Sequence, residues 1–549
     1  MTKVVNYGND VNQKFLSGVT KLSDVVGSTL GARGRNVAIN DRGRVHCTKD
    51  GITVARAFEL KDPVENMGAI LVREASAKTN SECGDGSTGS IILTEAIYKN
   101  GLKRVMLGAN PVQVKNGIDK AVEKVVEYIN TISKPISTKE EIKQVAKVSA
   151  NGDEEIAEVI AEMFSKIGKN GTIRVEDGSS TKMESKIVEG MVLEDRGYIS
   201  PYFVNNESLE CYMDHPYILI SDKRMSNIND LVKTLQTVAK SGRPLLIIGE
   251  EVEGDVLSTL VLNRLRGGMT ICAIKAPSYG DYRKGLLNDI ATLTGGQLVS
   301  DDTGIKLQEA TLESGFLGQA KSVTVTKTST TIVGGLGDKE SINALVKKLE
   351  TEVENTKDEF QVKKLRERLA KLTTGIGVIQ CGAATEAELK EKKDRVDDAF
   401  NSAKNSIKSG VVPGGGTTLL YAMQNVKKAF EAHTDLYNSL VGDEVVGVQV
   451  LCDSLDAPIR RILNNAGEKT DLIVSKLLDS ENVQNCGYDV VKKEFVNMID
   501  SGIVDPTAVI LSEVKNASSI AGLMLTTDAS IVDIPDEQDK KPVPQMPMM

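Results

Sequence analysis

The middle of the chain carries a pattern that differs from both of its ends. Four short apolar runs, YILISD (217–222), PLLIIG (244–249), TICAIKA (270–276) and GQLVS (296–300), are separated by segments with helical periodicity. Short buried strands that alternate with helices indicate a parallel sheet covered by helices. Because helical patterns dominate the chain before and after this region, the sequence predicts an α/β domain inserted into a helical one.

The 549 residues are too many for one hydrophobic core, so several domains are expected. Near the amino end, Phe15, Val19, Leu22 and Val26 lie at helical spacing, which predicts a helix over 9–30 that stops at Gly31. The runs VAIN and VHCTKDG flank the turn DRGR and predict a β-hairpin. Further along, FQVKKLRERLAKLTTG predicts a long helix at the solvent edge.

Composition excludes several kinds of function. The net charge of −9, without a strongly basic block, argues against a nucleic-acid surface. We expect no membrane span, since no apolar run approaches the roughly 20 residues required, and without a targeting pattern at the amino terminus we expect a cytoplasmic protein. The seven cysteines and three histidines are scattered, which is typical of reduced thiols and excludes a zinc site or a histidine triad.

The glycine-rich stretch SECGDGSTGS (81–90) lies between two helical segments and has two interpretations. It lacks the lysine of a Walker A loop and the spacing of a dinucleotide fingerprint, so its composition alone favours a solvated turn. The alternative is a phosphate loop, because glycines let backbone amides approach an anion and the next helix opens toward it. Asp85 would then suit a magnesium ion.

Three other stretches contain residues able to take part in such chemistry. TLGARGRN (29–36) and TKDG (48–51) supply glycines, a hydroxyl, a lysine and the carboxylate of Asp50, while RVDDA (395–399) supplies Asp397 and Asp398. Each also has an ordinary interpretation as a helix end, a hairpin turn or a solvated helix face. Spacing alone leaves both interpretations open.

The joint pattern of motifs is more specific. TKDGITVAR, GDGSTGS, VVEGM, DRGYISPYF, GVVPGGGTTLL and MIDSGIVDPTAV occur in the same order as in group I chaperonins of the GroEL type. The chain resembles that family from about Val4 to about Pro535. The resemblance implies a multi-domain α and α/β subunit: a helical equatorial domain (1–131 and 409–535), a small intermediate domain (132–188 and 376–408), an inserted α/β apical domain (189–375) and a flexible tail (536–549).

The same resemblance implies an ATP site with Mg²⁺ and K⁺. Asp85 matches the magnesium ligand, Asp398 the carboxylate that orients the attacking water, and Asp50 a second acid beside it. K⁺ is expected near Thr29, Lys49 and Thr88. The positions that match nucleotide contacts are Thr29, Leu30, Gly31, Lys49, Asp85, Gly86, Ser87, Thr88, Gly414, Gly415, Asp489 near the adenine and Asp505 near the ribose.

The resemblance also implies partners. An apolar apical surface would bind unfolded client proteins and a GroES-type co-chaperonin, and the subunits would form a homo-oligomeric ring of seven. Client-binding positions are Tyr198, Tyr202, Phe203, Val232, Leu235, Leu257, Val261 and Leu262, although an aromatic cluster by itself is more often core. Lys469 and Leu107 depart from the family pattern at ring-to-ring contacts, so one ring or two remain open.

The implied function is ATP-dependent capture and enclosure of non-native polypeptides. The alternative is a ring scaffold that holds clients with little ATPase activity, since Gly89 replaces a hydroxyl residue in the phosphate loop. A small-molecule phosphotransferase is disfavoured, because no acid and base set for a specific substrate accompanies the loop.

Overall fold

The computed structural model divides the chain into two compact units. Unit 1 comprises Met1–Glu162, Asp177–Lys182 and Cys381–Met549, and unit 2 comprises Met163–Glu176 and Met183–Gln380. An α/β unit is thus inserted into a mainly helical one, while the further separation of an intermediate domain stays a prediction. The described residues are 3–41, 44–150, 152–168, 172–178, 183–194, 196–204, 209–356, 358–373, 375–383, 385–433, 435–479 and 485–533, so the expected tail (536–549) lies outside them.

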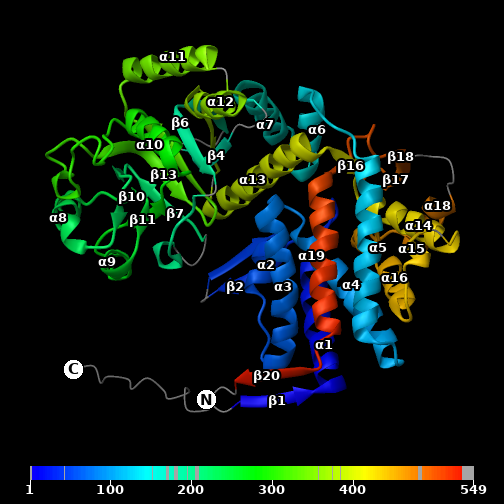
Figure 1. Ribbon diagram of the computed structural model, residues 1–549. Coiled ribbons are helices and arrows are strands. Elements are labelled where there is room, and N and C mark those ends of the chain that lie inside the picture. Colours follow the sequence, from blue (N-terminus) through cyan, green and yellow to red (C-terminus); the bar gives the residue numbers. More distant parts are fainter. Residues whose placement is uncertain are drawn as a thin grey trace, which may run out of the picture. The chain divides into compact units, whose positions relative to one another are not determined.

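Helices make up most of unit 1 (Figure 1). They are α1 (Gly8–Gly27), α2 (Gly51–Ala57), α3 (Pro63–Cys83), α4 (Ser87–Met106), α5 (Pro111–Ile132), α6 (Lys139–Ser149), α7 (Glu154–Ile167, which runs on into unit 2), α13 (Glu386–Ser409), α14 (Thr417–Glu431), α15 (Asp435–Asn438), α16 (Glu444–Cys452), α17 (Ala457–Asn465), α18 (Thr470–Asp479) and α19 (Thr507–Leu525). The strands are β1 (Lys3–Tyr7), β2 (Val37–Asp41), β3 (Arg44–Thr48), β16 (Val411–Pro413), β17 (Cys486–Asp489), β18 (Glu494–Asn497), β19 (Val504–Pro506) and β20 (Ala529–Asp533).

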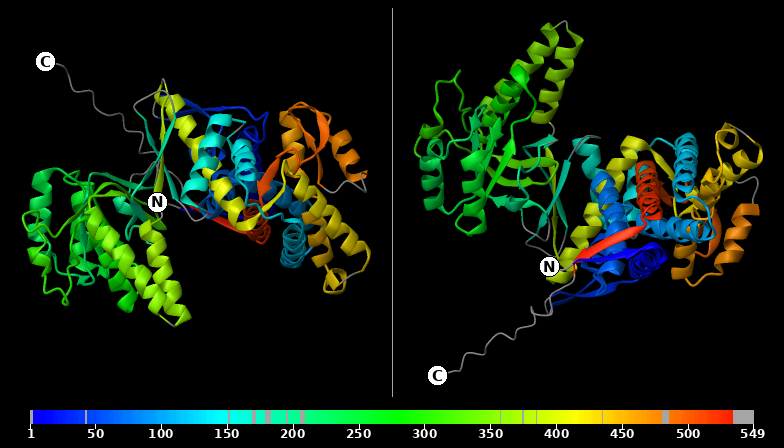
Figure 2. Two further views of the ribbon diagram at one scale, coloured as in Figure 1. Left: turned by 90° about the horizontal axis from the view of Figure 1, so that it is seen from above. Right: turned by 60° about the horizontal axis from the view of Figure 1, so that its bottom comes forward.

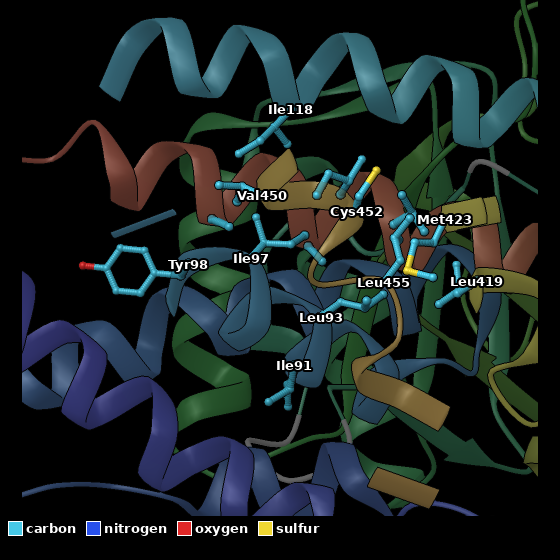
Figure 3. Packing of buried hydrophobic residues seen from close by; sticks show 14 of the residues in the cluster. Ile91, Leu93, Ile97, Tyr98, Ile118, Leu419, Met423, Val450, Cys452 and Leu455 are labelled. Carbon is cyan, nitrogen blue, oxygen red and sulfur yellow. The ribbon is translucent and has the colours of Figure 1, made fainter. Parts of the chain in front are cut away.

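The core of unit 1 forms around α19, which packs along α3, α4 and α5. Figure 3 shows buried side chains of α4, α5, α14 and α16 meeting in this core, among them Ile97, Ile118 and Met423. Within the described residues, α19 alone has the length and hydropathy of a membrane span, and 67% of that stretch is buried in unit 1. Its apolar composition is therefore that of a central core helix.

Helix α1 confirms the predicted apolar face but ends earlier than expected. Phe15, Val19, Leu22 and Val26 are all fully buried, as their spacing predicted. The helix ends at Gly27, where the sequence suggested Leu30. The hydroxyls of the next two residues, Ser28 and Thr29, bond back to carbonyls of the last turn, which stabilises an end at that point.

The two ends of the described chain meet in unit 1. β1 pairs antiparallel with β20, with Val5 opposite Ile531, and the right view of Figure 2 shows β20 as a red arrow near the blue amino-terminal segment. β2 and β3 form the predicted hairpin, with Ile39 opposite His46. The seven cysteines form no disulfide, as their scatter predicted.

Unit 2 is built on a mixed sheet in the strand order β12-β10-β8-β13-β14-β6, with β7 paired to β13. Its helices are α8 (Val232–Ser241), α9 (Gly254–Leu265), α10 (Gly280–Thr294), α11 (Lys339–Asn355) and α12 (Glu359–Thr373). Its strands are β4 (Thr172–Asp177), β5 (Glu184–Val188), β6 (Gly190–Glu194), β7 (Cys211–Asp214), β8 (Tyr217–Ile220), β9 (Arg224–Met225), β10 (Leu245–Gly249), β11 (Glu251–Val252), β12 (Ile271–Lys275), β13 (Gly318–Val325), β14 (Ser329–Gly335) and β15 (Ile376–Cys381).

Three of the four predicted strands of unit 2 are confirmed. β8, β10 and β12 are parallel neighbours, as the alternation of strands and helices predicted. The fourth prediction, 296–300, was wrong, because this segment makes only a single bridge, from Val299 to Ser221. The wholly parallel sheet was also wrong, since β13, β14 and β6 extend it with antiparallel pairs.

Candidate functional site

The glycine-rich stretch 84–89, called the 84–89 loop below, joins α3 directly to α4. α3 ends at Cys83, and Gly84 and Gly86 adopt φ of 65° and 82°, the left-handed region that favours glycine. These two residues let the chain reverse within three positions, so that α4 begins at Ser87. The amides of the first turn of α4 therefore open toward the loop, an arrangement suited to an anion.

Asp85 lies at the centre of this loop and is held on both carboxylate oxygens. Its Oδ1 accepts from the amide of Gly86 at 2.6 Å, and its Oδ2 accepts from Oγ of Ser402 on α13 at 2.7 Å. Burial raises the pKa of Asp85, and the charge of Asp50 adds to the shift, while the two hydrogen bonds oppose it. A carboxylate fixed in this way is ready to accept a positive charge.

Helix α13 brings Asp398 to the same place. It packs against the loop so tightly that a Cβ on Gly84 would lie 2.5 Å from Cγ of Asn401, and the side chain of Asn405 donates to the carbonyl of Cys83. Burial raises the pKa of Asp398 well above its ordinary range, and the charges of Asp85 and Asp50 add to it. The charge of Asp85 thus reaches Asp398, while the roles of the two carboxyls toward a nucleotide stay predictions.

Asp394 lies one turn before Asp398 on α13. Burial raises its pKa to about 6, and the charge of Asp50 adds to the shift. This residue was not among the predicted site residues. Its spacing of four from Asp398 could have indicated that both carboxyls lie on one helix face.

Asp50 caps a helix and also lies near the carboxyls of Asp85 and Asp398. Its carboxylate caps α2 by accepting from the amides of Ile52 and Thr53 at 3.1 Å each, and from Oγ1 of Thr53. The start of α2 lies against α4, since a Cβ on Gly51 would sit 2.0 Å from Oγ1 of Thr88. Lys49 is partly buried, and burial lowers its pKa. The predicted residues from 48–51 therefore adjoin those of the 84–89 loop.

The turn after α1 supplies Thr29, Leu30 and Gly31. Oγ1 of Thr29 donates to the carbonyl of Val26, and Gly31 has φ of 84°. The side-chain amide of Asn465 donates to the carbonyls of Gly27 and Leu30 at 2.8 and 2.9 Å. These contacts fix the shape of the turn, and its role toward a nucleotide stays a prediction.

A second glycine loop, at 414–416, is positioned by strand pairing. β16 pairs with β19, which sets Val412 opposite Asp505. Gly414 and Gly415 follow β16 directly, and therefore lie at the end of this strand pair. Gly415 and Gly416 adopt φ of 65° and 76°, so glycine is required there. Burial raises the pKa of Asp505 to about 7, and the charge of Asp85 contributes. Asp505 is thus linked electrostatically to Asp85, while its predicted contact with a ribose stays a prediction.

The carboxylate of Asp489 stabilises a turn of its own segment. It ends β17, and its Oδ1 accepts from the amides of Val491 and Lys492 at 2.8 and 3.1 Å, in the turn that leads to β18. This turn occupies Oδ1 of the buried carboxylate, and Nζ of Lys492 lies 4.0 Å from Oδ2. A contact between Asp489 and an adenine stays a prediction.

Glu513 on α19 was not predicted from the sequence. Its side chain is only 7% exposed, and burial raises its pKa well above the ordinary range, with further effect from Asp505 and Asp85. A carboxyl in a largely apolar helix was the signal that could have identified it. The electrostatically linked carboxyls of unit 1 therefore include Asp50, Asp85, Asp394, Asp397, Asp398, Asp505 and Glu513.

These carboxyls do not form a complete metal site by themselves. In the part of the chain that the structure describes, no three His, Cys, Asp or Glu side chains are arranged to hold a metal ion. Mg²⁺ in nucleotide sites commonly takes one or two carboxylates together with phosphate oxygens and water. The oxygen donors and the negative charge around Asp85 fit such a shared site.

The predicted client-binding residues lie in unit 2, and they differ in accessibility. Tyr202 and Leu262 are 59% and 49% exposed. Phe203 is fully buried in the core of unit 2, so the expectation that it lies on the binding surface was wrong for this conformation. The others are half-buried, with part of each side chain reaching solvent: Tyr198, Val232, Leu235, Leu257 and Val261.

Comparisons with known proteins agree with this architecture. Residues 22–535 match the model of the TCP-1/cpn60 chaperonin family. Two crystal structures of the chaperonin gp146 from the bacteriophage EL 2 (Pseudomonas aeruginosa), both in the presence of ATP-BeFx, have the same fold. One has a TM-score of 0.68 at 21% identity and covers 97% of this chain and 100% of that chain. The other has a TM-score of 0.61 at 20% identity, and the match covers 97% of this chain and 99% of that chain.

Proposed function

Since the chain belongs to the TCP-1/cpn60 chaperonin family, we propose that it is an ATP-dependent chaperonin that captures non-native polypeptides on unit 2 and encloses them in the cavity of a ring. One observation carries the nucleotide part of this proposal. Asp85 and Asp398, which belong to segments far apart in the sequence, gather at the glycine loop that opens α4.

The residues of unit 1 would divide the work of ATP hydrolysis. The amides at the start of α4 and the turn at 29–31 would bind phosphates, and Asp85 would hold Mg²⁺. Lys49 adds positive charge, and K⁺ would bind near Thr29, Lys49 and Thr88. The magnesium nucleotide supplies the bond to be cleaved and a cation that neutralises phosphate charge.

Asp398 would orient the attacking water and accept its proton. Burial raises the pKa of Asp398 and so favours its protonated form, which cannot act as a base. Positive charge beside it lowers the pKa again. Nucleotide binding with its cation would therefore switch Asp398 into the active form.

Unit 2 offers the apolar surface that client capture needs. Tyr202 and Leu262 are exposed, and Leu265, three residues after Leu262 at the end of α9, is 62% exposed. Exposed apolar side chains bind apolar segments of other chains without reading a specific sequence. A co-chaperonin of the GroES type would compete for the same surface.

ATPase measurements test the proposal. We expect Mg²⁺-dependent turnover in the wild type, a decrease of about 10²–10⁴-fold in kcat for Asp398→Ala, and little change in nucleotide affinity. No turnover in the wild type, together with intact client binding, would favour the alternative of an ATPase-poor holding scaffold. Native mass spectrometry with and without ATP tests the seven-membered ring, and a monomer under both conditions would contradict it.

A further inference from the structure

Glu513 is the most deeply buried carboxyl of the cluster, and it points at the 84–89 loop. A Cβ built on Gly89 would lie 2.1 Å from its Oε1 and 2.7 Å from its Oε2, and one on Gly86 would lie 3.0 Å from Oε1. The carboxylate therefore fills the space that a side chain at position 89 would occupy. It reaches the first turn of α4 from the side of α19.

The carboxylate of Glu513 differs in its hydrogen bonding from the side chains near it on α19. Within the described residues neither of its oxygens accepts a hydrogen bond. Its neighbours on α19 behave differently, since Ser512 and Asn516 both donate to Glu82. A largely buried carboxylate that no protein group donates to must be satisfied by water, a proton or a cation.

The charge around the loop points to a cation. Two carboxylates meet at Gly86, because its amide donates to Oδ1 of Asp85 and a Cβ built on it would lie 3.0 Å from Oε1 of Glu513. A nucleotide bound at the loop would add several more negative charges, and among the described residues assigned to this site Lys49 carries the positive charge. A single divalent ion at Asp85 leaves this charge largely uncompensated.

We propose that Glu513 is a direct ligand of a second divalent cation, bound between the α19 carboxylate and the phosphates at the 84–89 loop, in addition to the ion at Asp85. This inference rests on the proposed nucleotide site. Carboxylate and phosphate oxygens are the hard ligands that Mg²⁺ and Mn²⁺ prefer, and two cations that share phosphate oxygens are a known way to neutralise charge in phosphoryl transfer.

Glu513→Gln separates this role from a structural one. Glutamine has the shape of a protonated glutamic acid but no charge, so it preserves the packing against Gly86 and Gly89. If Glu513 is only a neutral buried carboxyl, the variant will bind cations and nucleotide as the wild type does. If it is a ligand, the variant will lose the second ion.

The measurement is the number of Mn²⁺ ions bound per chain at saturating ADP, read from the free Mn²⁺ signal in electron paramagnetic resonance. We expect two ions in the wild type and one in Glu513→Gln. The affinity for the second ion should fall at least about 10-fold, because even the loss of a residue that only hydrogen-bonds to a metal ligand lowers metal affinity by about that much. Glu82→Gln is the matched control, because it removes a nearby carboxylate that bonds Ser512 and Asn516 instead of facing the loop. It should keep two ions.

Gly89→Ala is the second variant, in case Glu513→Gln fails to fold. Gly89 lies in the first turn of α4 without a positive φ, so alanine suits the helix, but its Cβ displaces the Glu513 carboxylate. It should also weaken the second ion. A wild type that binds one Mn²⁺, with unchanged binding in Glu513→Gln, would overturn the second cation and leave the proposed function intact. A wild type that binds no ADP would overturn both.

Discussion

Ser402 on α13 donates a hydrogen bond from Oγ to Oδ2 of Asp85 at 2.7 Å, across 317 positions of sequence. This bond ties the helix that carries Asp398 to the loop that carries the proposed magnesium ligand. We expect Ser402→Ala to weaken Mg-ADP binding about 2- to 10-fold, the equivalent of one ordinary hydrogen bond. Isothermal titration calorimetry would measure it.

The control for this prediction lies one turn further along the same helix. Ser406 has a buried Oγ that finds no hydrogen-bond partner among the described residues. Ser406→Ala should therefore leave Mg-ADP affinity unchanged. Equal losses in both variants would mean that α13 responds to any loss of a hydroxyl and that the bond to Asp85 has no special part.

Asp50 caps α2 and also places a negative charge near Asp398, and two variants separate these roles. Asp50→Asn keeps an oxygen able to accept from Ile52 and Thr53, so thermal stability should change little, whereas Asp50→Ala should lose about 1 kcal/mol of unfolding free energy. Both remove the carboxylate near Asp398, and we expect both to lower ATP turnover. Full turnover in Asp50→Asn would restrict Asp50 to its capping role.

Asp394 gives a pH dependence of stability with a defined sign. Its folded pKa is raised to about 6, above the value of about 3.9 in an unfolded chain. The folded state therefore binds more protons between these values, and the stabilisation that it gains at low pH is lost as pH rises toward about 6. Urea unfolding without nucleotide and metal should show this decline.

Asp394→Asn should flatten that decline relative to the wild type. Asp10→Asn, which changes an exposed carboxyl in the first turn of α1, serves as the control and should retain it. Identical pH profiles in the wild type and Asp394→Asn would show that the carboxyl is not shifted.

Tyr202 and Phe203 are neighbours with opposite environments, and their variants should behave oppositely. Phe203→Ala removes a fully buried ring and should cost about 3–5 kcal/mol of stability. Tyr202→Ala removes a ring that is 59% exposed, so stability should hold while the protection of a denatured client from aggregation decreases. Light scattering of the client and thermal unfolding of the variants measure the two effects. A Tyr202→Ala variant with full client protection would exclude this residue from the capture surface.

Local patterns predicted those parts of the fold that local physics decides. The spacing of Phe15 and Val19 identified the buried face of α1, and the apolar runs identified β8, β10 and β12. The end of α1 was misplaced because hydroxyl bonds from Ser28 and Thr29 close the helix at Gly27. The antiparallel part of the unit 2 sheet depends on pairings between distant segments, which periodicity does not contain.

The candidate site was predictable only through the family resemblance. Motif spacing left Asp85 and Asp398 as separate possibilities, since their approach depends on packing between α13 and the 84–89 loop. Glu513 was not predicted as a site residue, because glutamate is rarely buried and the sequence alone places it in solvent. Phe203 was assigned to the surface although the turn at Pro201–Phe203 directs it into the core.

The central position of α19 has a consequence for synthesis on the ribosome. α3 and α4 pack against a helix that begins only at Thr507, after the whole of unit 2 has been made. From the end of α4 at Met106 to that point lie about 400 residues, which take roughly 20–80 s to translate at about 5–20 residues per second. Within that interval unit 2 is completed at Gln380, whereas the apolar faces of α3 and α4 still await their partner. A nascent chain of this protein is thus itself a candidate client for the chaperones of the cell that makes it.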